Sequence, residues 1–107
     1  MARKSRDVEC WVVLVEVEAL TDSREFRKGE RAFVNVVVPE RTEGYARQKA
    51  KDLLFALGFR SIDVDEVTLL DLDAGTVPKR SEVRRLAKAA IRTGEPQWGS
   101  FHSWDDS

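Results

Sequence analysis

Acidic and basic side chains are segregated in the second half of the chain, and paired carboxylates are the first candidates for chemistry. Between residues 63 and 73 the chain has five acids and no basic residue: Asp63, Asp65, Glu66, Asp71 and Asp73. Carboxylates two residues apart on a strand point to the same side, where they can hold Mg²⁺ or share a proton. Acids at such positions also keep an exposed strand soluble and prevent edge pairing, which is the interpretation we favour.

Basic residues dominate the following segment, 79–92, where Glu82 is the single acid. At about 100° per residue, four of these residues fall within an arc of about 100°, beside the apolar face of an expected helix. We call them the basic stripe: Arg84, Arg85, Lys88 and Arg92. A basic stripe fits an acidic protein surface or a phosphate backbone. It also fits a solvated helix face, and Arg92 near the helix end interacts favourably with the helix dipole.

The sequence contains few residues that could act as nucleophiles or metal ligands. The chain has one cysteine, Cys10, and one histidine, His102, so it can form no internal disulfide and no zinc site built from four Cys or His ligands. His102 has serines and aspartates close by in the sequence, but neighbours on an extended chain do not form a catalytic triad by proximity alone. We therefore predict no catalytic residue, no metal site and no cofactor, and favour a protein that is not an enzyme.

Two runs of alternating apolar residues, 11–19 and 32–38, predict strands joined as an antiparallel hairpin by the polar segment 21–29. A third period-two segment covers 59–72, and its apolar parity shifts between Val64 and Val67. The shift predicts a β-bulge near Asp65 and Glu66. Residues 97–104 form a candidate fourth strand.

Two helices complete the pattern. Thr42 and Ser81 are candidate N-caps, and Gly58 and Gly94 suit the left-handed position at a helix end. The second helix has an apolar face that is expected to include Ile91. The order ββαβα, with a possible final β, predicts an α+β two-layer sandwich with a mainly antiparallel sheet of three or four strands and both helices on one face.

The aromatic residues of the C-terminal segment are candidates for packing or for binding. Phe55 lies opposite the apolar face of the first helix, and Trp98 and Phe101 are expected to pack within the chain. Trp104 lies beside two acids and is the candidate exposed anchor for a partner.

Length and composition limit the remaining choices. A chain of 107 residues, with 42% hydrophobic residues, is a single globular domain, for which we expect residues 1–7 and 105–107 to be frayed. Its 18 basic and 19 acidic residues nearly cancel, so net charge gives no reason to expect nucleic acid binding. The apolar run at 10–15 is too short to cross a bilayer and no signal peptide follows the basic start, so we expect a cytoplasmic protein without membrane association.

The arrangement of these segments resembles small uncharacterised bacterial α+β proteins and, more distantly, immunity proteins that neutralise secreted bacterial toxins. The segments that carry the resemblance are 11–17, 32–38, the helix end at Leu57-Gly-Phe59, and 93–104. It implies a bacterial, non-enzymatic binder of protein and assigns no functional residue. We expect binding through the basic stripe, the acidic residues Asp63, Asp65 and Glu66, and Trp104. The alternative is nonspecific nucleic acid binding through the basic stripe.

Overall fold

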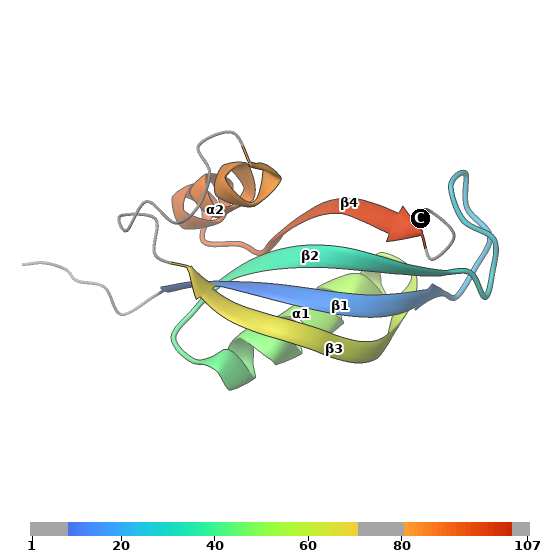
Figure 1. The fold of residues 1–107 in the computed structure, drawn as a ribbon, viewed down its shortest axis with the longest axis horizontal. Helices are drawn as coiled ribbons and strands as arrows, with labels where there is room; N and C mark the ends of the chain where they lie inside the picture. Colours follow the sequence, from blue (N-terminus) through green and yellow to red (C-terminus); the bar gives the residue numbers. More distant parts are fainter. Residues whose placement is uncertain (1–8, 71–80, 104–107) are drawn as a thin grey trace, which may run out of the picture.

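The computed structural model describes residues 9–70 and 81–103, which form four strands and two helices. In chain order these are β1 (Glu9–Ala19), β2 (Arg31–Glu40), α1 (Glu43–Ala56), β3 (Phe59–Leu70), α2 (Glu82–Thr93) and β4 (Gln97–Ser103). The strands form one antiparallel sheet in the order β3-β1-β2-β4 (Figure 1). The predicted α+β class, element order and fourth strand are confirmed. The predicted frayed termini, 1–7 and 105–107, lie outside the described residues.

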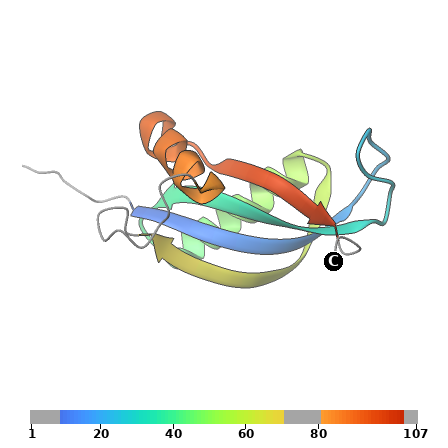
Figure 2. The same cartoon turned by 45° about the horizontal axis from the view of Figure 1, so that its top comes forward.

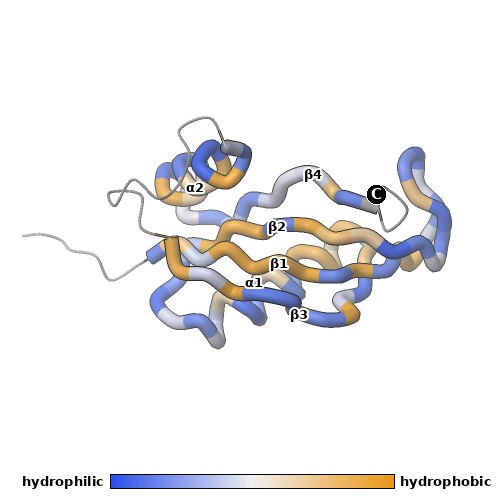
Figure 3. Tube along the Cα trace, in the orientation of Figure 1, coloured by the Kyte–Doolittle hydropathy of each residue, from blue (hydrophilic) through white to orange (hydrophobic). Residues whose placement is uncertain are grey.

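The β1–β2 hairpin is the centre of the sheet, and hydrophobic residues follow both strands along their length (Figure 3). On one face, alternate valines of the two strands are fully buried: Val13, Val15, Val17, Val34, Val36 and Val38. They pack against the buried side of α1, which consists of Ala46, Ala50 and Leu54. The two alanines let the helix lie close to the sheet, and Leu54 is the largest fully buried side chain of α1.

The two helices lie on opposite faces of the sheet, so the prediction that both cover one face is wrong. Cys10 and Val37 alternate with the valines that face α1, and they pack instead against Leu86, Ala87 and Ala90 of α2. Figure 1 shows α1 behind the sheet, and the turned view in Figure 2 shows α2 in front of one end of it. The physical reason is that β1 and β2 are apolar on both faces at this end, and the second apolar face also needs cover.

β3 is an edge strand with two irregularities in its pairing to β1. Leu14 and Val15 are consecutive on β1, but their partners are Glu66 and Val64, so Asp65 is an extra residue. This β-bulge confirms the one predicted near Asp65 and Glu66. A second shift leaves Ile62 as an extra residue between the pairs at Asp63 and Ser61.

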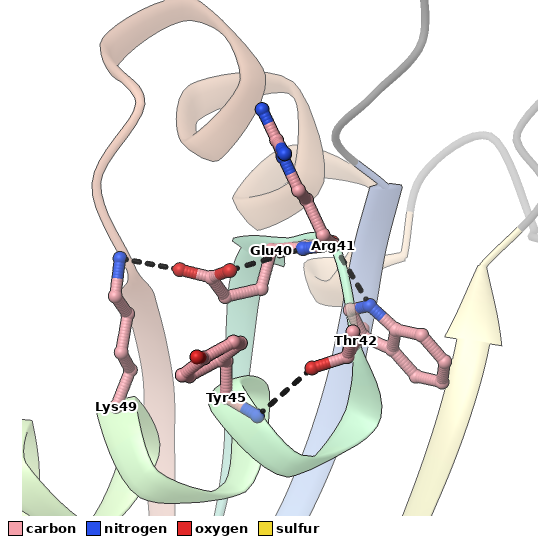
Figure 4. Close-up of polar contacts among 6 residues, drawn as sticks. Glu40, Arg41, Thr42, Tyr45 and Lys49 are labelled. Atoms are coloured by element: carbon pink, nitrogen blue, oxygen red, sulfur yellow. Dashed lines mark hydrogen bonds and ion pairs between the residues drawn. The ribbon is translucent and has the colours of Figure 1, made fainter.

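The connection from β2 to α1 is fixed by several polar contacts (Figure 4). The Thr42 hydroxyl caps α1 by accepting a hydrogen bond from the Tyr45 backbone N–H at 3.3 Å. Lys49 Nζ lies 2.6 Å from Glu40 Oε2, and the Arg41 backbone N–H donates to Glu40 Oε1 at 3.0 Å. These two contacts, the one with Lys49 being the stronger, hold the pKa of Glu40 below its ordinary value.

The Glu40 contacts predict a pH-dependent contribution to stability. Because its pKa is lower in the folded than in the unfolded chain, ionised Glu40 stabilises the fold above the unfolded pKa, and this stabilisation is lost as pH falls through the folded pKa. Glu40→Gln is therefore expected to lower the free energy of unfolding by less than about 1 kcal/mol near neutral pH and by progressively less in acid. Urea unfolding of both proteins at several pH values from neutral to acidic tests this prediction. An equal difference at every pH would contradict the prediction.

No helix within residues 9–70 and 81–103 is both long enough and apolar enough to cross a membrane.

Candidate functional site

The basic stripe lies on a helix that is firmly held at both ends. The Ser81 hydroxyl caps α2 by accepting a hydrogen bond from the Arg84 backbone N–H at 3.0 Å, and Gly94 ends the helix with a φ of 75°. Between these caps, Ala87 and Ala90 are fully buried against the sheet. The stripe is thus presented by a rigid element, which reduces the entropy lost when a partner binds.

Glu82, in the first turn of α2, connects the helix to β4 through hydrogen bonds. Its Oε2 accepts hydrogen bonds from the Ser100 backbone N–H at 3.1 Å and from the Ser100 hydroxyl at 3.0 Å. β4 has an irregular register here, and Gly99 leaves the space that the carboxylate occupies, since a Cβ at this position would overlap Glu82. Glu82 also lies 3.8 Å from Arg85, so the one acid of α2 is shared between β4 and the basic stripe.

The basic stripe is concentrated at Lys88 and Arg92. Both are exposed, and in the described part of the chain neither has an ion pair. Arg85 is exposed and Arg84 is half-buried. By contrast, two of the cations of α1 have ionic partners, since Arg47 pairs with Glu43 and Lys49 with Glu40. The structure therefore keeps the four predicted residues together as one surface with an excess of positive charge.

Ile91 is a large hydrophobic residue beside the basic stripe, and helical periodicity predicts the wrong environment for it. It was expected on the buried face of α2, but 60% of it is exposed, against 7% of Leu86. At about 100° per residue, Ile91 lies about 90° away from the middle of the buried side, which runs through Val83, Ala87 and Ala90. The sequence contained a signal for this exposure, because Ile91 directly precedes Arg92 and follows Lys88 by about one helical turn.

The acidic residues of β3 do not join the basic stripe. Asp63, Asp65 and Glu66 are all exposed on β3, the strand at one edge of the sheet. The helix α2 packs mainly on β2 and β4, toward the other edge. Asp63 and Glu66 pair with Glu16 and Leu14 of β1, so these two acids share one face, and Asp65 is the extra residue of the bulge. The bulge thus changes the alternation after Asp65, and all three acids remain exposed.

Metal binding by these acids receives no support from their geometry. Within residues 9–70 and 81–103, no group of three or more His, Cys, Asp or Glu side chains is arranged to hold a metal ion. Asp71 and Asp73, the other acids of the predicted cluster, lie outside the described residues. The bulges and the exposed charges are instead typical of an edge strand protected against pairing with another sheet.

This protective role makes a prediction about self-association. Replacing Asp63, Asp65 and Glu66 by Asn, Asn and Gln removes the charges but keeps the side-chain sizes. The triple variant is expected to stay folded and to self-associate at concentrations where the natural protein does not, because like charges oppose edge-to-edge pairing. Sedimentation velocity of both proteins measures this. An unchanged distribution over a tenfold concentration range would rule out protection by charge.

A shallow pocket of about 180 Å³ lies between α1 and β3 and had no sequence signal. Its lining includes Arg47, Lys51 and Asp63, and the buried Oγ of Ser61, also in the lining, has no hydrogen-bond partner among the described residues. The lining charges are of both signs, and Arg47 is already paired with Glu43. The pocket therefore shows no preference for a ligand of either charge.

The aromatic side chains divide between the core and the surface. Phe101 stacks on Phe59 with ring centres 4.6 Å apart and meets Phe26 edge to face at 5.6 Å. Phe101 thus packs within the chain, as expected, whereas Phe55 remains 70% exposed and Trp98 41% exposed. Trp104, the expected anchor, lies outside the described residues.

The two residues considered for nucleophilic chemistry are far from a catalytic arrangement. Cys10 is buried under α2 with its Sγ 4.0 Å from the Ala87 carbonyl oxygen, and burial raises the pKa of the thiol. A raised pKa lowers the thiolate fraction, so Cys10 is a poor nucleophile in the folded protein. His102 is exposed on β4 opposite Phe33.

No protein-family model, curated protein or solved structure matches this chain.

Proposed function

We propose that the protein is a small binding module without enzymatic activity, and that the exposed face of α2 docks an acidic region of another protein. The observation that carries this proposal is the pair of exposed cations, Lys88 and Arg92, which have no ionic partner among the described residues and stand on a firmly docked helix. Charge complementarity of this kind steers association and excludes partners of like charge. Neutralisation of a secreted toxin domain, which the sequence resemblance favours, is one role of this type.

Nonspecific binding of nucleic acid is the second candidate function. It uses the same four residues of the basic stripe and requires only phosphate contacts. The two candidates differ in salt dependence, because counterion release makes binding to a phosphate backbone steeply dependent on salt. A protein interface with an apolar centre is less sensitive to salt.

The test compares three immobilised baits in lysate of the cells that make this protein. The first is the natural chain, and the second is Lys88→Glu/Arg92→Glu. The third is the matched control Arg24→Glu/Lys28→Glu, which makes the same change of net charge on exposed residues in the loop at the opposite end of the sheet (Figure 1). Each bait is washed at low and then at high salt.

The proposal predicts a protein that is retained at high salt by the natural chain and the control and lost by the α2 variant. Nucleic acid captured at low salt and released at high salt would favour the second candidate. Equal capture by all three baits would remove the face of α2 from the binding site.

A further inference from the structure

We propose that the face of α2 recognises an acidic protein segment that also presents an apolar side chain, and that Ile91 contacts this side chain beside the two cations. The inference rests on the proposed function and specifies the chemistry of the partner. We call this set of residues the Ile91 patch: Lys88, Ile91 and Arg92.

The three residues of the patch are contiguous on the helix surface. Lys88 and Arg92 are four positions apart and therefore adjacent on one side of the helix, and Ile91 lies one turn after Lys88. Glu82 faces β4, and at about 100° per residue Ile91 lies about 180° around the helix from Glu82. The apolar side chain is thus directed away from β4 and is bordered on one side by positive charge.

Repulsion between the cations of the patch favours the binding of an acidic partner. Lys88 and Arg92 are a like-charged pair at the (i, i+4) spacing, which disfavours a helix. In α1 the same spacing holds favourable pairs, Arg47 with Glu43 and Gln48 with Asp52. Carboxylates supplied by a partner would relieve the repulsion in α2, whereas α1 has no comparable excess of charge.

The exposure of Ile91 favours a protein partner over a phosphate backbone. A large apolar side chain that is 60% exposed gains from burial only when the partner offers an apolar surface. Phosphate contacts use cations and hydrogen-bond donors, and leave an aliphatic side chain beside them without a role. Protein interfaces, in contrast, place apolar contacts at the centre with charged residues around them.

A second copy of the chain is a poor occupant of this surface. A symmetric contact between two α2 faces would bring the cations of one patch against those of the other. Like charges in contact across an interface oppose association. A partner with an excess of acidic residues therefore fits this surface better than a second copy docked through the same face.

The experiment titrates two capped peptides of about 12 residues into the ¹⁵N-labelled full chain and follows backbone amide resonances. One peptide has glutamates and aspartates on either side of a central pair of leucines. The other is identical except that serines replace the leucines. The proteins are the natural chain, Ile91→Ser, Lys88→Glu/Arg92→Glu and the matched control Arg24→Glu/Lys28→Glu, and the same spectra show whether each variant is folded.

The natural chain is expected to bind the leucine peptide about tenfold more tightly than the serine peptide, with the largest shifts at the Ile91 patch. Ile91→Ser should abolish this preference and leave affinity for the serine peptide unchanged. The Lys88→Glu/Arg92→Glu variant should bind neither peptide, and the matched control should bind both as the natural chain does.

Equal affinity of the natural chain for the two peptides would overturn the role of Ile91 while leaving the proposed function in place. Absence of shifts at the patch with either peptide would overturn both the inference and the acidic-partner function. Tighter binding of a single-stranded oligonucleotide of about 20 nucleotides, with a steep salt dependence, would assign the surface to nucleic acid instead.

Discussion

Replacing Ala90 by glutamate is expected to release α2 from the sheet and expose the Cys10 thiol. Ala90 is fully buried in the cluster that contains Cys10 and Val37, and no described cation lies in that cluster. A buried and unpaired carboxylate costs several kcal/mol, so we expect a loss of at least about 3 kcal/mol in the free energy of docking α2. The rate at which an aromatic disulfide reagent modifies Cys10 measures this directly, because the thiol is shielded while α2 is docked.

The matched control for this variant is Ile91→Glu, which places the same side chain at the next residue but on the exposed surface. It is expected to change stability by no more than about 0.5 kcal/mol and to leave Cys10 as unreactive as in the natural chain. Equal Cys10 reactivity in Ala90→Glu and the natural chain would show that α2 does not dock through Ala90. Such a result would also remove the rigid platform on which the proposed binding face depends.

Replacing Leu54 by alanine is expected to produce the largest loss of global stability. Leu54 is fully buried between α1 and the sheet and is one of the largest fully buried side chains among the described residues. Truncation of a buried leucine removes apolar contacts and leaves a cavity, which costs about 2–5 kcal/mol. A loss of this size is a large fraction of the stability of a small domain.

Urea unfolding followed by circular dichroism measures the effect of Leu54→Ala, with Leu57→Ala as the control. Leu57 is near the same end of α1 but is 38% exposed, so we expect its truncation to cost less than Leu54→Ala by at least about 1 kcal/mol. Similar losses in the two variants would mean that α1 is not anchored through Leu54.

The position of α2 on the sheet has a consequence for binding. Because α2 packs mainly on β2 and β4, the basic stripe lies toward one edge of the sheet, and the acidic strand β3 forms the other edge. The two charged segments therefore do not neutralise each other by direct contact among the described residues. Each is free to act on its surroundings: the acidic residues of β3 to oppose edge pairing, and the basic stripe to attract an acidic partner.

Local sequence features were sufficient to predict the elements and their ends. Alternating valines predicted the hairpin, Thr42 and Ser81 the helix starts, and Gly58 and Gly94 the left-handed residues that follow. The change of apolar parity in the third strand predicted the bulge that the register confirms at Asp65. These features act over a few residues, through backbone conformation and short-range hydrogen bonds, so they can be read without knowing the fold.

Placement of α2, exposure of Ile91 and separation of the charged segments were decided only by the tertiary structure. The sequence determined by itself that β1 and β2 are apolar on both faces near Cys10 and Val37, and that α2 has one buried side. It did not determine which face α2 covers, because an apolar stripe packs against either apolar face of a sheet. Docking through Leu86, Ala87 and Ala90 then fixed the rotation of the helix, and this rotation left Ile91 outside beside Lys88 and Arg92. Such choices depend on packing between residues more than 40 positions apart, which local periodicity does not contain.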